Sequence, residues 1–164
     1  MDAPEEEWVE IYVQPGESHL VRGPAVFRTV LGSCVGVTFR HVGLEISALC
    51  HPMMPRHPHR GREKLDVAAA RRYVDFAIRD LAEQFDALGA RRGQIEVKVF
   101  GGADVLRVST NRSRPSVGRL NSEMALEVLS AEGFNVAASQ LGGPVGIHID
   151  FFTTTGEVRL RRLR

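Results

Sequence analysis

The sequence is poor in cysteine and contains no long apolar run. Two cysteines among 164 residues are too few for a small protein held together by disulfide bonds. No apolar run approaches the roughly eighteen residues that a membrane-spanning helix needs. Residues 1–7 carry acids, whereas a secretory signal starts with basic and then apolar residues. These absences predict a cytoplasmic protein with free thiols that does not insert into a membrane.

The sequence also lacks an excess of charge of one sign. Its 21 basic and 20 acidic residues leave a formal net charge of +1. The arginines are interleaved with acids, and aromatic residues, which could stack on bases, make up only 7%. This composition disfavours a nucleic-acid partner and fits a solvated surface or an acidic protein partner.

What is present is the composition of an ordinary globular protein, with 43% hydrophobic and 25% charged residues. A chain of this length forms one domain as a rule, and neither an internal repeat nor a linker divides residues 1–164. We therefore expect a single domain.

Alternating apolar residues and glycine or proline turns predict a series of strands. These strands cover residues 8–13, 25–31, 35–39, 44–50, 95–99, 134–138, 145–151 and 158–160. Apolar residues at helical spacing predict one helix over 65–88, and a second is expected from a cap at Asn121 or Ser122 to about residue 132. Residues 51–62 and 107–115 read as loops. Because hairpins dominate both ends, this order predicts an α/β layered sandwich of mostly antiparallel β-sheet with two helices packed against it.

Cys34 is the first candidate for chemistry, because it lies between two glycines in Gly32-Ser33-Cys34-Val35-Gly36. The spacing matches the nucleophile elbow of hydrolases with sulfur in place of oxygen, but that elbow requires a helix after the nucleophile. A strand is expected here, so we reject the elbow. A cysteine nucleophile still needs a base or a positive field nearby.

His51 is the natural candidate for that base. If 35–39 and 44–50 pair as an antiparallel hairpin, the start of one strand lies beside the end of the other, and Cys34 becomes a neighbour of His51. A cysteine in an apolar stretch is, however, commonly a core residue, and a histidine before Pro52 commonly a loop residue. The residues alone leave both interpretations open.

A zinc site is a further alternative. Cys50, His51, His57 and His59 have side chains of the types that bind zinc. Adjacent residues such as Cys50 and His51 can rarely aim at one metal ion, so this hypothesis is disfavoured. Cys50 is expected instead to be a buried strand residue.

Residues 29–37, which contain Cys34, resemble the cysteine motif of the CheD family, the chemoreceptor glutamine deamidases of bacterial chemotaxis. The resemblance extends over about residues 26–161 and keeps the family's order of motifs. The other matches are a histidine motif at 48–55, a Gly-Gly-Ala motif at 98–103, Val117-Gly118 with Asn121 and Glu123, Leu141-Gly142-Gly143, and Thr155-Gly156-Glu157-Val158.

The resemblance implies that Cys34 is the nucleophile and His51 the general base and acid. It implies Thr29 as the third catalytic residue, with Arg28 as the alternative one position earlier. The implied reaction converts receptor glutamines to glutamates, with methyl-ester hydrolysis in some members. The implied partners are chemoreceptor helices and a CheC-type phosphatase, and no metal or organic cofactor is expected. A binding module that mainly regulates the phosphatase is the alternative function.

Overall fold

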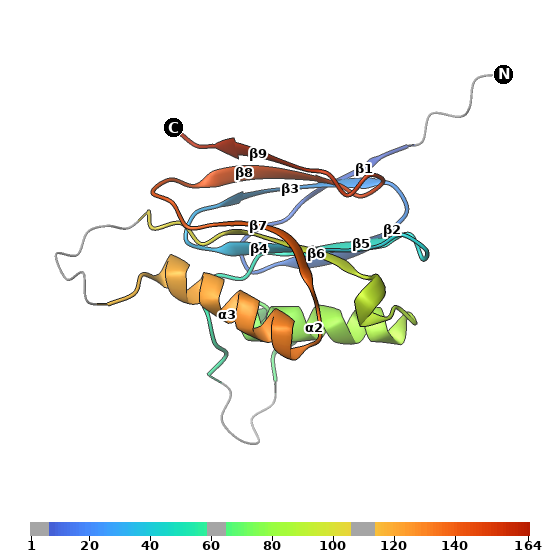
Figure 1. Cartoon of the computed structure of the whole chain (residues 1–164), viewed down its shortest axis with the longest axis horizontal. Helices are drawn as coiled ribbons and strands as arrows, with labels where there is room; N and C mark the ends of the chain where they lie inside the picture. The colour runs from blue at the N-terminus through green and yellow to red at the C-terminus, as the bar shows by residue number, and fades with distance from the viewer. Residues whose placement is uncertain (1–6, 59–64, 106–113) are drawn as a thin grey trace.

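Two β-sheets stack face to face, and helices cover the free face of one of them (Figure 1). The structure is a computed structural model that describes residues 7–58, 65–105 and 114–164. Parts of the two expected loops, residues 59–62 and 107–113, lie outside these ranges.

The sheets contain four and five strands. The four-stranded sheet has the order β1 (Val9–Tyr12), β3 (Ala25–Leu31), β8 (Ile147–Phe152) and β9 (Val158–Arg162). The five-stranded sheet has the order β2 (Ser18–Arg22), β5 (Ile46–Cys50), β4 (Val35–His41), β6 (Glu96–Gly101) and β7 (Val136–Leu141). Neighbouring strands are antiparallel except for the pairs β1–β3 and β6–β7. The expected α/β layered sandwich is thus confirmed.

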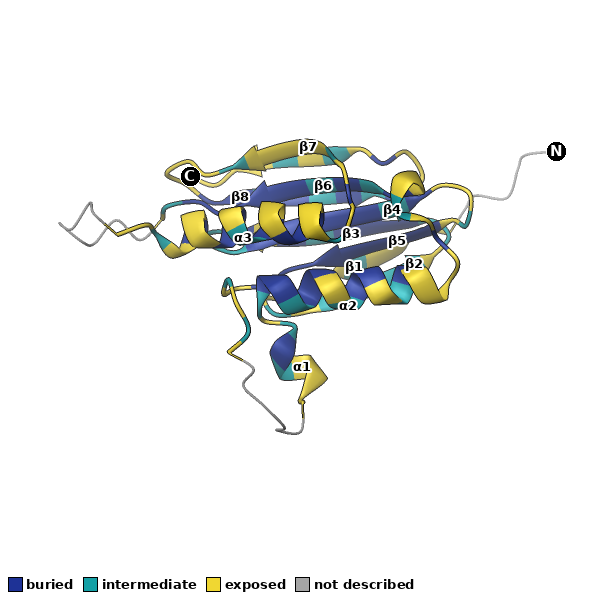
Figure 2. Ribbon diagram, turned by 60° about the horizontal axis from the view of Figure 1, so that its bottom comes forward, coloured by how far each residue is buried: buried dark blue, intermediate teal, exposed yellow. Residues whose placement is uncertain are grey.

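The helical layer consists mainly of α2 (Val74–Ala87) and α3 (Val117–Ala131), with a short α1 (Val67–Ala70) and a 3-10 turn at Arg92–Gln94. Both long helices turn their buried faces toward the five-stranded sheet and their exposed faces outward (Figure 2). Of the helices that the structure describes, none combines the length and the apolar character that crossing a bilayer requires.

The five-stranded sheet contributes to two apolar cores because side chains alternate between its faces. In β5, Ile46, Ala48 and Cys50 pack toward the helices, whereas Leu49 belongs to the core between the sheets. His51 follows Cys50 directly. Its side chain therefore continues on the face of Leu49, toward the four-stranded sheet.

The prediction of a single helix over 65–88 is wrong, because the chain leaves the helical path between α1 and α2. The carbonyl of Arg72 accepts hydrogen bonds from the amides of Met53 and Met54, at 2.7 and 3.0 Å. The Val74 amide donates to the Met54 carbonyl at 2.8 Å. These long-range bonds replace the helical ladder, and local apolar spacing cannot reveal them.

The expected cap of the second helix is also wrong. Ser116 is the N-cap of α3, and its side chain accepts a hydrogen bond from the Arg119 amide. The helix thus starts before Asn121, which is fully buried within it.

The strand β2 was not expected from the sequence. It forms an edge of the five-stranded sheet and pairs antiparallel with β5. Its residues are half-buried or exposed, so it lacks the clear apolar alternation of an inner strand. The hairpin of β4 and β5 is confirmed, with Val37 opposite Cys50.

Candidate active site

Cys34 lies in the turn between β3 and β4, at one end of the stacked sheets. The loop after β6 holds this turn: the Gly102 amide donates to the Cys34 carbonyl at 2.8 Å, and the Ala103 amide donates to the Gly32 carbonyl at 2.9 Å. The Cys34 side chain is half-buried. The turn is therefore fixed in position, and Cys34 within it stays partly exposed.

His51 lies next to this turn, as the hairpin geometry predicts. Its backbone amide donates to the Glu17 carbonyl at 2.9 Å, which ties it to the loop before β2. On the other side, the Val35 amide and the Pro52 carbonyl are 3.4 Å apart and extend the β4–β5 pairing by one hydrogen bond. Cys34 directly precedes Val35 and His51 directly precedes Pro52, so this hydrogen bond places the two segments side by side at the end of the hairpin.

Thr29 contacts the imidazole from the opposite sheet. Its Oγ1 lies 2.7 Å from His51 Nδ1 and donates to the Val13 carbonyl at 2.6 Å. A hydroxyl has a single proton, so once this proton goes to Val13 the oxygen can only accept from the ring. The arrangement assigns the ring proton to Nδ1 and leaves the lone pair on Nε2. Within the described residues, Nε2 is buried and has no hydrogen-bond partner.

Burial sets the protonation of the pair. It lowers the pKa of His51 from 6.5 to about 4, against the opposing effects of the Val13 carbonyl and the Glu17 charge. Burial also raises the pKa of the Cys34 thiol, and its own backbone amide opposes this shift. At neutral pH the pair therefore rests as a thiol and a neutral imidazole whose Nε2 is unprotonated.

Arg28, the alternative to Thr29, faces the other way. Its guanidinium pairs with Asp150 and Glu10 on the outer face of the four-stranded sheet, both at 3.1 Å. Neighbouring residues of a strand point to opposite faces. The structure thus brings Thr29 into contact with His51 and does not bring Arg28 there.

Asn121 joins the two segments that carry Cys34 and His51. Its side-chain Nδ2 donates to the Ser33 carbonyl at 2.9 Å and to the Met53 carbonyl at 3.0 Å. Sequence reasoning treated Asn121 as a possible helix cap and missed this position. The signal was available, because Asn121 lies four residues before the apolar Ala125 and thus on the buried face of the helix.

The zinc hypothesis does not fit the arrangement of its ligands. Cys50 packs among the core residues beneath the helices, and burial raises its pKa to about 12. His51 points to the opposite face of the sheet, so the two side chains cannot share a metal ion. His59 lies outside the described residues, and within the described ranges no three side chains of the types that bind metals form a group.

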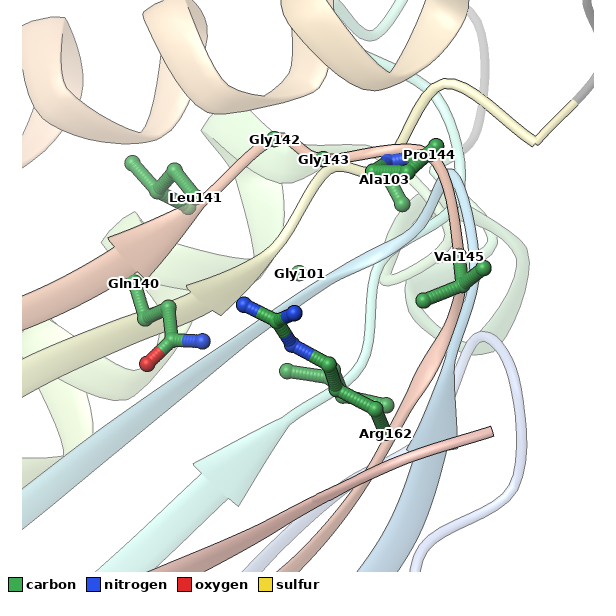
Figure 3. Close-up of a pocket in the computed structure, with 10 residues that line it drawn as sticks. Gly101, Ala103, Gln140, Leu141, Gly142, Gly143, Pro144, Val145 and Arg162 are labelled. Atoms are coloured by element: carbon green, nitrogen blue, oxygen red, sulfur yellow. The ribbon is translucent and has the colours of Figure 1, made fainter. Parts of the chain in front are cut away.

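A pocket of about 400 Å³ is lined in part by Gly101, whose backbone lies against the Cys34 carbonyl. Figure 3 shows the residues that line it. Gly101 in its wall has a φ of +98°, and a side chain there would collide with the Cys34 carbonyl, so only glycine fits. The guanidinium of Arg162 points into the pocket from β9 (Figure 3). The other lining residues are Ala103, Gln140, Leu141, Gly142, Gly143, Pro144, Val145 and Ile147.

Comparison with known proteins decides the family. A family described as "CheD chemotactic sensory transduction" matches residues 53–162. A protein of Geobacter sulfurreducens named "Probable chemoreceptor glutamine deamidase CheD 2" is 44% identical over 153 residues, which cover 93% of this chain and 89% of that protein. The chain belongs to the CheD family. A CheD relative from Maridesulfovibrio salexigens is 33% identical over 93% of this chain and 91% of its own length.

The family match starts at residue 53. The alignments with the two CheD relatives each cover 93% of this chain, and the few residues they leave uncovered cannot include the whole segment from Thr29 to His51. Among solved structures, the "hypothetical protein YfiH" of Bacillus licheniformis has a TM-score of 0.50 and 10% identity. The match covers 82% of this chain and 63% of that one. It supports the fold alone.

Proposed function

We propose that this CheD-family protein deamidates glutamine side chains of chemoreceptors, with Cys34 as nucleophile, His51 as general base and acid, and Thr29 as the residue that orients His51. The relatives are named chemoreceptor glutamine deamidases. The observation that carries the proposal is the hydrogen bond from His51 Nδ1 to Thr29, which leaves the lone pair on Nε2, in a segment that lies next to the Cys34 turn.

The first step forms a tetrahedral intermediate, which is the precursor of a thioester. His51 Nε2 takes the proton of the Cys34 thiol, and the sulfur adds to the carbonyl carbon of the substrate carboxamide. Burial lowers the pKa of His51 to about 4, so the imidazole is neutral at neutral pH and its Nε2 lone pair is free, and the same shift makes the imidazolium a stronger acid for the next step. The carbonyl oxygen becomes negatively charged, and the backbone amides of the turn at Ser33 and Cys34 are the proposed donors that stabilise it.

The second step breaks the carbon–nitrogen bond. The imidazolium of His51 gives its proton to the nitrogen, because ammonia is a far better leaving group than an amide anion. Water then attacks the thioester, the same imidazole takes a proton from it, and the sulfur leaves. The product is glutamate, and the Cys34 thiol is restored.

The site suits a segment on the surface of another protein. Cys34 is half-buried at the end of the sheets, and the pocket in front of Gly101 and Arg162 adjoins its turn. This opening supports receptor helices as the substrate. We place the reaction in the cytoplasm, where thiols stay reduced. A CheC-type phosphatase partner stays a prediction from the family resemblance.

Mass spectrometry of a chemoreceptor cytoplasmic fragment tests the proposal. After incubation with the protein, selected glutamines should show the mass change that replaces an amide by a carboxylic acid. The Cys34→Ala variant is the matched control and should leave the fragment unchanged. An unmodified fragment with the wild-type protein, or equal conversion with both proteins, would contradict the proposed activity.

A further inference from the structure

Asn121 is the one side chain of α3 that bonds to both segments of the candidate site. The Ser33 carbonyl belongs to the residue before Cys34, and the Met53 carbonyl lies two residues after His51. One NH₂ group thus spans the nucleophile turn and the histidine segment. Neither hydrogen bond goes to Cys34 or His51 itself.

The orientation of this amide is determined by its neighbours. Both partners of Nδ2 are carbonyl oxygens, which only accept hydrogen bonds, so the amide cannot be turned over. Oδ1 of Asn121 is buried and has no partner among the described residues. Buried polar atoms are normally paired, and an exception suggests a role other than stability. The Nδ2 group of Asn121 thus pairs with two backbone carbonyls of the site, whereas Oδ1 has no partner among the described residues.

The helix is packed closely enough to hold this amide in place. A side chain at Gly118 would collide with the Ala103 carbonyl, and one at Gly102 would collide with Ser122 Oγ. The backbone of α3 therefore lies against the same loop that bonds to the Cys34 turn. Met53 is held from its other side as well, since its amide donates to Arg72 at 2.7 Å.

We propose that Asn121 is a positioning residue that sets the separation and orientation of Cys34 and His51. The consequence for deamidation rests on the proposed function, but the geometric effect can be measured on the thiol itself. If Asn121 aligns the pair, His51 can assist Cys34 only while Asn121 is present. The effects of removing the two residues must then be non-additive.

The experiment is a double-mutant cycle on the alkylation of Cys34. Iodoacetamide labelling at pH 7 is followed by peptide mapping in wild type, His51→Ala, Asn121→Ala and the double variant. Each single change should slow the labelling of Cys34. The double variant should be labelled no more slowly than His51→Ala, which corresponds to a coupling of roughly tenfold in the labelling rate. Thermal melting of every variant reports whether it is folded.

Ser122→Ala is the matched control, because Ser122 Oγ donates only within the helix, to the Gly118 carbonyl. It should leave the labelling rate unchanged. Asn121→Ser is measured in parallel as a milder variant. Additive effects, or equal labelling with and without His51, would overturn the proposal. So would the failure of both Asn121 variants to fold, since Asn121 would then serve the fold rather than the site. None of these outcomes depends on receptor deamidation, so failure of the proposed function is detected separately.

Discussion

Thr29 and His51 come from different β-sheets, and the 2.7 Å contact between Thr29 Oγ1 and His51 Nδ1 connects the two. Thr29 lies on β3 with its side chain toward the five-stranded sheet, and His51 directly follows β5. Both are essentially inaccessible, with 0% and 1% of their surface exposed. The orientation of the candidate base is thus set by how the sheets pack on each other.

Removing the Thr29 hydroxyl should cause an intermediate loss of activity. We expect Thr29→Ala to lower kcat/KM by roughly ten- to hundredfold, below the 10²–10⁴-fold usual for a general base, and Thr29→Ser to lower it slightly. The Val13 carbonyl also loses its hydrogen bond from Thr29, at a cost of about 1 kcal/mol of stability. Deamidation kinetics and urea unfolding measure both effects.

Arg28→Ala is the matched control for Thr29→Ala. Arg28 is the neighbour of Thr29 on the same strand but pairs with acids on the outer face. We expect near wild-type kinetics. Full activity in Thr29→Ala would show that Cys34 and His51 act as a dyad, and a loss confined to Arg28→Ala would move the third role to that residue.

Cys34→Ala should abolish activity without unfolding the protein, and His51→Ala should lower activity strongly. Cys34 occupies a turn and is half-buried, so Cys34→Ala removes little buried surface and all of the nucleophile. His51→Ala should lower the rate by roughly 10²–10⁴-fold, because the same imidazole serves the base and acid steps. Rates are measured on the receptor fragment and folding by circular dichroism. A His51→Ala variant that keeps more than about a tenth of wild-type activity contradicts the mechanism.

The two thiols should differ strongly in reactivity. Cys34 is half-exposed, whereas Cys50 is fully buried with a pKa of about 12. Limiting iodoacetamide should therefore label Cys34 first, and its labelling should accelerate as the pH rises, since burial raises the pKa of this thiol too. Peptide mapping over a pH series measures both rates. Preferential labelling of Cys50 in the folded protein would reverse the assignment.

Burial of neutral His51 should make stability depend on pH. Its pKa is about 4 in the folded protein against 6.5 ordinarily, so between these values the unfolded chain binds the extra proton. The contribution of His51 is therefore fully present above about pH 6.5 and is lost as the pH falls toward 4. Urea unfolding at several pH values should give a free energy of unfolding that rises less steeply with pH in His51→Gln than in wild type. Equal slopes would mean that His51 is not buried in its neutral form.

The sequence carried much of the local information. Alternation in 35–39 and 44–50 predicted the β4–β5 hairpin, and the hairpin explained why Cys34 and His51 are neighbours. The resemblance to the CheD family is confirmed by relatives of up to 44% identity among those compared. The break between α1 and α2 could not be seen in this way, because the bonds of Arg72 lead to Met53 and Met54, far away along the chain.

By itself, the sequence determined the residue types, the strand periodicity and the turn that presents Cys34. Tertiary structure alone decided that Thr29 rather than Arg28 contacts His51, that Nδ1 carries the ring proton, and that Asn121 spans the two segments of the candidate site. The physical reason is that neighbouring strand residues face opposite sides, and only the packing of a second sheet makes one side the interior. Burial and hydrogen bonds between distant segments then set the pKa and orientation of a side chain whose identity the sequence already contains.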